Sequence, residues 1–411
     1  MKKTIALLLC VAMMLSILPM AVFAEGNTGE IVLPPDCFHS YIYTDNEDGE
    51  THTVTCNYCG GTYSEAHTFV EGVCVCGAAE APAAPVYDST LKFNGHNLFL
   101  DSSLGVNWGI TASIVDNAKD VYVVITKADG ILQQNQSLTV HKNDFTFSGS
   151  KYYAMFPTVA SCEMGDTLIA TLYVVDADGT VRYSAPDEYS VLTYANAAMN
   201  SYINTATSNP NSKQYLGMRL MVALLNYGAA AQTFFSYKTD ALVNKDLTPA
   251  QLAFAPADST FTNYRDYGAN NGEVIFNGTS LNLQEKINSE IKISVAGLTS
   301  CTKDDLTAVV VNTETSEVIQ TIEGKDFVPT GANFYIDVTV LNTTQLRTKV
   351  EITVYKDYGE ATQAAVSSTA TYSVESYVAV ANAAGATGRS AIIGRAVLNY
   401  GDAAAAYFAF K

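Results

Sequence analysis

Most of this chain is one segment used twice, and that duplication limits its fold more than any other feature. Three matched pairs show it: Phe93-Asn94-Gly95 with Phe276-Asn277-Gly278, Tyr189-Ser190-Val191 with Tyr372-Ser373-Val374, and Leu225-Asn226-Tyr227-Gly228 with Leu398-Asn399-Tyr400-Gly401. The residue numbers within the first two pairs differ by the same amount, and those within the third pair differ by ten less. A nearly constant offset over about 100 residues, then one deletion between helical patterns, indicates duplication of a whole module rather than a short solenoid repeat.

Each copy begins with strand patterns and ends with helix patterns. The first copy has alternating runs rich in Val, Ile, Thr and Tyr at Leu91–Leu100, Asn107–Ile114, Val121–Thr126, Tyr152–Val159 and Leu168–Val175. Turn clusters such as Asp176-Ala177-Asp178-Gly179 separate these runs, as in an antiparallel sandwich of about seven short strands. Two helical patterns follow, at about Val191–Ala206 and Lys213–Tyr237.

We therefore expect a mainly β fold with α-helices: two tandem antiparallel β-sandwich (Ig-like) modules, each followed by a helical hairpin, preceded by a small zinc-ribbon-like unit. The expected boundaries are a signal peptide at 1–24, a Cys/His unit at 36–77, an Ala/Pro linker at 78–88, module 1 at 89–240, a linker at 241–268 and module 2 at 269–411.

The second helix of each copy carries one apolar stripe at spacings of three and four residues. The stripe is Leu224, Tyr227, Ala231 and Phe234 in the first copy and Val397, Tyr400, Ala404 and Tyr407 in the second. We interpret Tyr227 and Tyr400 as core residues, with Gly228 and Gly401 allowing close approach to the sheet. The alternative is that both tyrosines belong to a binding face.

The N-terminus predicts export. Lys2 and Lys3 precede an apolar run from Ile5 to Met20, and Val22-Phe23-Ala24 supplies small residues before Glu25. This pattern is typical of a cleaved secretory signal peptide, and an uncleaved anchor helix is the alternative. We expect the protein to be secreted or held at the cell surface, without membrane insertion after signal removal.

Cysteine and histidine gather in one short unit. Eight candidate metal ligands lie there: Cys37, His39, His52, Cys56, Cys59, His67, Cys74 and Cys76. Eight ligands suit two tetrahedral zinc ions, and a polar unit of this size needs a staple other than hydrophobic burial. The Cys74-x-Cys76 spacing is one residue tighter than that of a usual zinc knuckle.

Structural zinc is the leading interpretation of this unit, and two others remain open. An exported chain meets an oxidising compartment, where thiols can pair as disulfides instead. A redox-active Cys-x-x-Cys would sit at a strand-to-helix junction, which the sequence does not predict here. Catalytic zinc is disfavoured because a closed four-ligand site leaves no position for water.

Charge and motifs exclude several function classes. A net charge of −18 disfavours nucleic acid and anionic lipid as partners. Common motifs for hydrolases, nucleotide binding and zinc proteases do not occur. Outside the Cys/His unit we expect His96 and His141 to be solvated loop residues, and Cys162 and Cys301 to be buried small residues or a fortuitous pair. Asp176 and Asp178 fit a hairpin turn better than a calcium loop.

Two elements resemble known extracellular proteins. The run from Cys37 to Gly77 resembles small zinc-binding units near the N-terminus of secreted proteins of Gram-positive anaerobes. The helix Leu224–Phe235 and its copy are similar to a repeat common in surface or extracellular proteins of clostridia-like gut bacteria. The resemblance implies an extracellular location and a modular, non-enzymatic role, and it brings no catalytic residues.

We therefore expect a secreted or cell-surface binding or adhesion protein that recognises a glycan or an extracellular protein through its tandem modules. Exposed Tyr or the single Trp, Trp108, could contact a sugar or a protein partner. One alternative is a structural spacer at the cell surface. Another is a carbohydrate-active enzyme, which would need two carboxyl groups about 5–10 Å apart.

Overall fold

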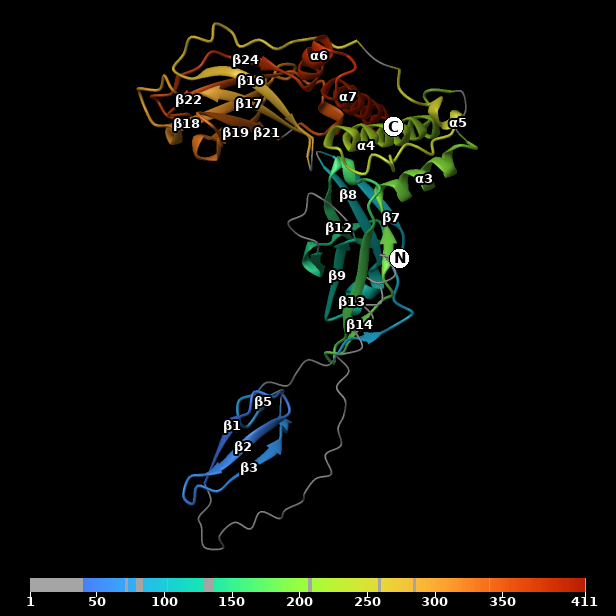
Figure 1. The fold of residues 1–411 in the computed structure, drawn as a ribbon, viewed down its shortest axis with the longest axis vertical. Helices are drawn as coiled ribbons and strands as arrows, with labels where there is room; N and C mark the ends of the chain where they lie inside the picture. Colours follow the sequence, from blue (N-terminus) through green and yellow to red (C-terminus); the bar gives the residue numbers. More distant parts are fainter. Residues whose placement is uncertain are drawn as a thin grey trace. The chain divides into compact units, whose positions relative to one another are not determined.

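A computed structural model gives the fold of the chain (Figure 1). It describes residues 40–70, 73–78, 84–101, 103–128, 137–205, 209–257, 260–283, 286–339 and 341–410. The chain divides into two compact units, residues 1–83 and 84–411. The expected signal peptide lies outside the described residues, as do Cys37 and His39.

The N-terminal unit consists of short strands in two antiparallel sheets. These strands are β1 (Tyr41–Asp45), β2 (Thr51–Cys56), β3 (Thr62–Ala66), β4 (Phe69–Val70) and β5 (Val73–Cys74). The larger sheet has the order β1-β2-β3, and β4 pairs with β5. The turn between β1 and β2 is closed by Asp48, whose carboxylate accepts hydrogen bonds from the backbone of Glu50 and Thr51 at 2.8 and 2.7 Å.

The first copy of the repeat folds into two sheets. Its strands are β6 (Val86–Tyr87), β7 (His96–Leu100), β8 (Leu104–Thr111), β9 (Asp120–Lys127), β10 (Ser137–His141), β11 (Thr146–Ser148), β12 (Lys151–Val159), β13 (Leu168–Val175), β14 (Val181–Tyr183) and β15 (Asp187–Tyr189). One sheet has the order β10-β9-β13-β14-β6, with β15 also paired to β13, and the other has the order β11-β12-β8-β7. All these pairs are antiparallel except β14 with β6.

Two of the expected strands are wrong in part. The run expected at Leu91–Leu100 forms a strand only from His96, because Gly95 turns the chain with a φ of +89°. The run expected to end at Ile114 ends at Thr111 and continues as the short helix α2 (Ala112–Asn117). Val115 of α2 is fully buried, so this segment reaches the core from a helix rather than from a strand.

The second copy also folds into two sheets. Its strands are β16 (Ile275–Asn282), β17 (Asn288–Ser294), β18 (Leu306–Asn312), β19 (Val318–Glu323), β20 (Val328–Thr330), β21 (Asn333–Val338), β22 (Val350–Lys356), β23 (Ala364–Ala365) and β24 (Ala370–Tyr372). The sheet orders are β16-β17-β21-β20 and β19-β18-β22-β23, with β24 also paired to β22. A single buried cluster takes Ile293 and Ile336 from one sheet and Val310 and Ile352 from the other.

Helices follow the strands in both copies. They are α3 (Val191–Tyr202), α4 (Lys213–Phe235), α5 (Pro249–Leu252), α6 (Val374–Ala384) and α7 (Arg389–Phe408). Between the strands lie the 3₁₀ turns η1 (Lys142–Asp144), η2 (Ser161–Glu163), η3 (Lys303–Asp305), η4 (Gly324–Asp326) and η5 (Thr343–Gln345). The repeated Tyr-Ser-Val segment begins α3 and α6. The hydroxyls of Ser190 and Ser373 each accept a hydrogen bond from the backbone N–H three residues later in the chain.

The described fold is mainly β, with several antiparallel sheets. The finer expectation of Ig-like sandwiches with helical hairpins stays a prediction. Within the described part of the chain, no helix is both long and apolar enough to cross a membrane.

The long helices of the two copies pack against each other. In Figure 1, α4 and α7 lie side by side, and their buried residues belong to one hydrophobic cluster. Tyr227 and Tyr400 stack with ring centroids 5.8 Å apart and planes 12° apart. Both are buried, at 2 % and 0 % exposure, so the core interpretation of these tyrosines is confirmed. Their ring contact is with each other rather than with a strand.

Reciprocal hydrogen bonds also join the copies. Ser161, the first residue of η2, donates its hydroxyl to the Leu283 carbonyl of the second copy at 2.5 Å. Thr343, the first residue of η5, donates its hydroxyl to the Asp101 carbonyl of the first copy. Each copy therefore uses the same 3₁₀ turn to contact the other, as in the self-complementary interface of a two-fold dimer.

Candidate metal centre

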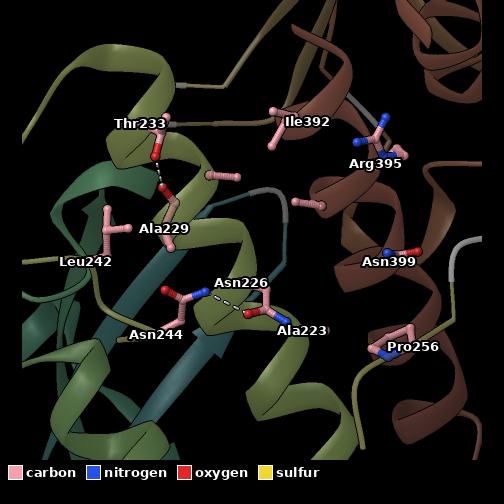
Figure 2. A pocket seen from close by; sticks show the side chains of 12 residues that line it. Ala223, Asn226, Ala229, Thr233, Leu242, Asn244, Pro256, Ile392, Arg395 and Asn399 are labelled. Atoms are coloured by element: carbon pink, nitrogen blue, oxygen red, sulfur yellow. Dashed lines mark hydrogen bonds between the residues drawn. The ribbon is translucent and has the colours of Figure 1, made fainter. Parts of the chain in front are cut away.

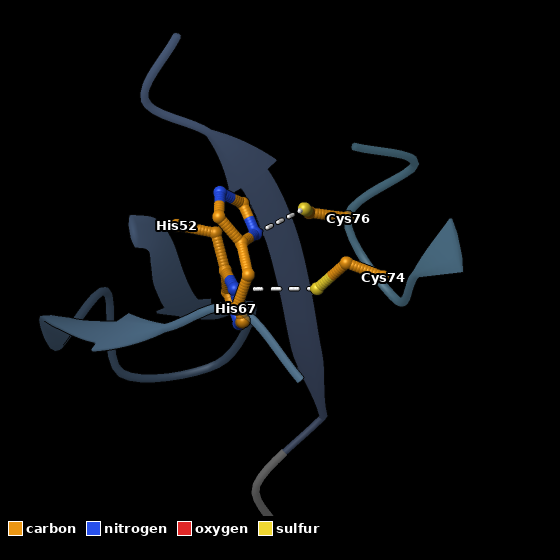
Figure 3. A group of neighbouring side chains, drawn as sticks. All are labelled: His52, His67, Cys74 and Cys76. Carbon is orange, nitrogen blue, oxygen red and sulfur yellow. Dashed lines mark hydrogen bonds between the residues drawn. The ribbon is translucent and has the colours of Figure 1, made fainter. Parts of the chain in front are cut away.

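Four of the eight expected ligands come together in the N-terminal unit. They are His52 in β2, His67 between β3 and β4, Cys74 at the end of β5, and Cys76 in the turn that follows. One ligand atom from each lies within 4.8 Å of all the others, and Figure 3 shows both histidine rings facing both sulfurs. The pairing of β2 with β3 and of β4 with β5 brings these four residues into one place.

The distances within the group suit a tetrahedral metal ion. The Cys74 sulfur lies 3.5 Å from Nδ1 of His52, and the Cys76 sulfur lies 3.4 Å from Nδ1 of His67. Zinc bound to sulfur at about 2.3 Å and to nitrogen at about 2.05 Å, with tetrahedral angles, separates the two ligand atoms by about 3.6 Å. The observed separations are therefore close to the edges of a zinc tetrahedron.

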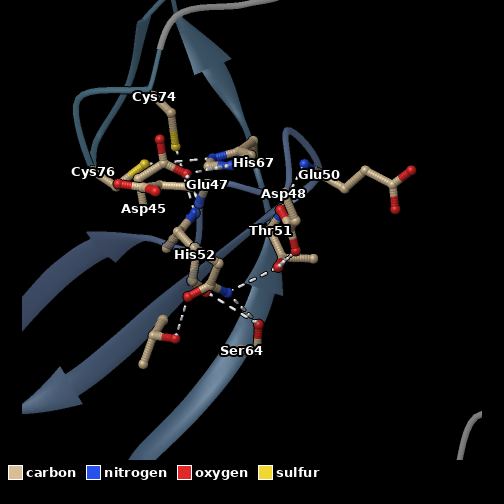
Figure 4. Close-up of polar contacts among 12 residues, drawn as sticks. Asp45, Glu47, Asp48, Glu50, Thr51, His52, Ser64, His67, Cys74 and Cys76 are labelled. Carbon is tan, nitrogen blue, oxygen red and sulfur yellow. Dashed lines mark hydrogen bonds and ion pairs between the residues drawn. The ribbon is translucent and has the colours of Figure 1, made fainter.

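Carboxylates stand behind both histidines, and Figure 4 shows that of Asp45 beside His67. Nε2 of His52 lies 3.0 Å from Glu65, in hydrogen-bond contact, and Nε2 of His67 lies 3.5 Å from Asp45. Metal-bound histidines commonly present their outer nitrogen to a carboxylate, which fixes the ring and the tautomer. The sequence analysis did not identify Glu65 or Asp45, although Glu65 lies opposite His52 in the β2–β3 register.

The electrostatics of the group favour a thiolate. Burial opposes ionisation of Cys74, but hydrogen bonds from the Cys76 backbone and from His67 lower the pKa of Cys74 to about 6. The same contact with the Cys74 sulfur raises the pKa of His67. Burial and the neighbouring Cys74 raise the pKa of Cys76. Because zinc binds thiolate and neutral imidazole, a bound ion would displace protons from these groups.

The group is enclosed by the small unit around it. The side chains of His52 and His67 are each 2 % exposed, and Cys74 is buried. Apolar neighbours are few: Val54 is buried nearby in β2, and Phe69 stacks on the His67 ring at 5.5 Å. Four protein ligands in a small, closed setting are typical of a structural metal site rather than a catalytic one.

The remaining expected ligands are not part of this group. Cys56 is buried at the end of β2, and Cys59 is exposed in the turn that follows. Cys37 and His39 lie outside the described residues. The structure therefore places the tightly spaced pair, Cys74-x-Cys76, at a candidate site. Cys74 and Cys76 are both free thiols.

The other histidines and cysteines have structural surroundings. The expectation of a solvated loop is wrong for His96, which lies in β7, contacts Asp187 at 2.8 Å and stacks on Tyr189. His141 is exposed but ends strand β10. Cys162 is buried, and burial raises its pKa to about 12. Cys301 is a half-buried free thiol in the second copy, so the two cysteines do not form a pair.

The expected hairpin turn at Asp176 and Asp178 is confirmed. The Asp176 backbone bonds to Thr180, and Asp178 accepts a hydrogen bond from the same residue, between β13 and β14. The Asp176 carboxylate binds Arg182 through two contacts of 2.6 and 2.7 Å. That guanidinium lowers the pKa of Asp176, and this ion pair explains the carboxylate without calcium.

A cavity of about 380 Å³ lies between α4 and α7. Figure 2 shows Asn226 and Asn399, the matched residues of the two copies, at its wall. Asn226 accepts a hydrogen bond from Asn244 at 2.9 Å. This cavity is a product of the pairing of the two copies, and its polar wall is already bonded in part.

Comparisons with known proteins find no match: no family model fits the chain, and no curated protein is significantly similar to it.

Proposed function

We propose that this protein is an exported, non-enzymatic binding protein at or outside the cell surface. In this proposal a structural zinc ion holds the N-terminal unit, and the two paired modules present the surface that recognises a glycan or an extracellular protein. The export pattern of residues 1–24 and the resemblance to surface proteins support the location.

The observation that carries the proposal is the geometry of His52, His67, Cys74 and Cys76. Sulfur–nitrogen distances of 3.5 and 3.4 Å and carboxylates behind both rings support zinc over a disulfide framework for these four residues. A closed ligand set supports a structural ion. The bound ion would then stabilise the N-terminal unit, and recognition would be left to the modules.

A second ion would use the other four expected ligands, Cys37, His39, Cys56 and Cys59. The first site does not depend on the second.

The pairing of the modules supports recognition by a fixed surface. The stacked Tyr227 and Tyr400 and the hydrogen bonds of Ser161 and Thr343 join the copies into one body. A rigid pair presents its surfaces without an entropic cost of ordering them on binding. The same rigidity would serve a spacer, which is the alternative.

Binding is tested with residues 25–411 on glycan and extracellular-protein arrays, with a variant lacking residues 25–85 as comparison. We expect specific binding that the variant retains. The spacer would be favoured if neither protein binds and if deletion of residues 25–85 abolishes retention at the cell surface.

A further inference from the structure

Five aromatic side chains form a row across the larger sheet of the first copy. The register places His141 opposite Tyr122, Tyr122 opposite Tyr173, Tyr173 opposite Tyr183, and Tyr183 opposite Tyr87. The row thus takes one residue from each of β10, β9, β13, β14 and β6. With about 4.8 Å between neighbouring strands, it extends for roughly 19 Å. We call these five residues the aromatic row.

The row faces away from the core. Tyr122 lies between Val121 and Val123, which are both fully buried. Tyr173 lies between Leu172 and Val174, which are buried as well. Because successive side chains of a strand point to opposite faces, the tyrosines stand on the outer face of the sheet. Tyr87, at one end of the row, is 54 % exposed.

The rings overlap without covering one another. Tyr122 and Tyr173 are parallel within 4°, with centroids 4.8 Å apart. Direct face-to-face contact would bring two rings to about 3.5 Å, so these rings are offset. Tyr173 and Tyr183 are 5.9 Å apart, and Tyr183 and Tyr87 are 5.7 Å apart at 62°. Tyr122, Tyr173 and Tyr183 are half-buried, so each keeps part of its surface exposed.

The fold does not require this row. Cross-strand aromatic pairs stabilise sheets, so a purely structural role is the first alternative. The second copy builds the matching sheet with Glu323 opposite Thr307, Thr307 opposite Tyr355, and Tyr355 opposite Ala365. Tyr355 is the one aromatic residue of that register row, and its ring neighbour is Tyr358 of the following turn, at 5.7 Å. The aromatic row is thus a property of the first copy alone, added to a sheet that forms without it.

The surroundings of the row suit an uncharged ligand. In the next register row, Thr139 and Thr171 flank Val124 on the same face. Two cations adjoin the row in sequence, and both are engaged. Arg182 of β14 pairs with Asp176 at 2.6 Å and Asp88 at 2.5 Å, and Lys142 donates to the carbonyls of Val115 and Ala118 at 2.7 and 3.2 Å. A protein with a net charge of −18 and this arrangement offers little attraction to an anionic chain.

We propose that the aromatic row is the binding site for an extended, neutral polysaccharide. Sugar rings carry apolar C–H faces that pack on aromatic rings, and their hydroxyls pair with the phenol and threonine hydroxyls. The length and openness of the row suit several consecutive sugars. Protein-binding hot spots instead favour Trp, Tyr and Arg in desolvated pockets. This inference rests on the proposed binding function and assigns it to the first copy.

The test measures binding of residues 25–411 to soluble neutral polysaccharides: mixed-linkage β-glucan, xylan, glucomannan and amylopectin. Polygalacturonate serves as the anionic comparison, and affinity electrophoresis followed by calorimetry gives the dissociation constants. The variants are Tyr87→Ala, Tyr173→Ala and the double variant. Tyr87 is exposed, so its removal leaves the core intact. Tyr355→Ala, at the position that matches Tyr173 in the second copy, is the control.

We expect at least one neutral polysaccharide to bind, with each tyrosine removed from the row weakening binding roughly two- to ten-fold and Tyr355→Ala having no effect. Polysaccharide binding that all variants retain would overturn this inference and leave the binding function standing. Binding of proteins alone on the arrays, or of polygalacturonate alone in this test, would likewise overturn the inference and leave the binding function standing. No binding to any glycan or protein would overturn both proposals.

Discussion

Gly228 and Gly401 show how single residues set the distance between a helix and the turn beneath it. A Cβ atom at Gly228 would lie 2.7 Å from the Met164 sulfur, and one at Gly401 would lie 2.9 Å from the Thr343 carbonyl oxygen. The sequence predicted close approach to the sheet at both glycines, and this is wrong: the neighbours are Met164, which follows η2, and Thr343 of η5. An apolar stripe reports burial without naming the partner.

Replacing these glycines should destabilise the fold. Alanine normally favours a helix over glycine by about 1 kcal/mol, but here its methyl group has no space. We expect Gly401→Ala to lower the free energy of unfolding by about 1–3 kcal/mol, and Gly228→Ala to lower it less, because a methionine side chain can move and a backbone carbonyl cannot. Urea unfolding measures this. Gly278→Ala, whose Cβ would make ordinary contacts of 3.6 Å, is the control, and stabilisation by Gly401→Ala would contradict the packing.

Metal binding by the Cys/His group should depend on pH through Cys74. Folding lowers the Cys74 pKa from 9.0 to about 6, so the stability that its thiolate contributes is full above about pH 9 and is lost as pH falls through about 6. The raised pKa of His67 adds proton competition in the same direction. We expect the zinc affinity, measured by competition with a chromogenic chelator, to fall as pH falls through about 6. A zinc affinity that is unchanged between about pH 7 and about pH 5 would contradict the ligand assignment.

At the scale of elements, the central contact is between α4 and α7. The first three residues of each predicted stripe, Tyr227 and Tyr400 among them, are buried, and the last ones, Phe234 and Tyr407, are half-buried against the same cluster. Both copies keep this stripe because the stripe of each copy covers the stripe of the other. Sequence could show that the two stripes match, but pairing between residues 173 positions apart depends on how the copies dock, which no local pattern encodes.

The stacked tyrosines should be energetically coupled. We expect the double variant Tyr227→Leu/Tyr400→Leu to be less destabilised than the sum of the single variants by about 0.5–1.5 kcal/mol, the range for an aromatic pair. Leucine keeps an apolar side chain in each position, so the fold should persist. Urea unfolding of the four proteins gives the coupling energy. Strict additivity would show that the rings stabilise the two copies independently.

At the scale of the whole molecule, the duplicated modules form one body and the Cys/His unit another. Repetition and composition predicted a mainly β fold in two copies. Which four of eight ligands share an ion could not be predicted, because β2–β3 and β4–β5 pairing decides it. The aromatic row was equally hidden, since strand register alone aligns Tyr122 with Tyr173 and Tyr183.

Cooperative unfolding should reveal the joined modules. Since α4 and α7 share one hydrophobic cluster, residues 84–411 should unfold in a single calorimetric transition, with equal calorimetric and van 't Hoff enthalpies. Two separate transitions would show that the copies are independent domains.

The most direct test of the account is the metal content of residues 25–411. Native mass spectrometry of residues 25–411 should show two zinc ions, one held by His52, His67, Cys74 and Cys76 and one by the remaining four ligands. His67→Ala should lose one ion, and hydrogen exchange should show lost protection in residues 41–78. His141→Ala, which alters a histidine outside the unit, should keep both ions. A chain that binds no metal and carries disulfides at these cysteines would contradict the account.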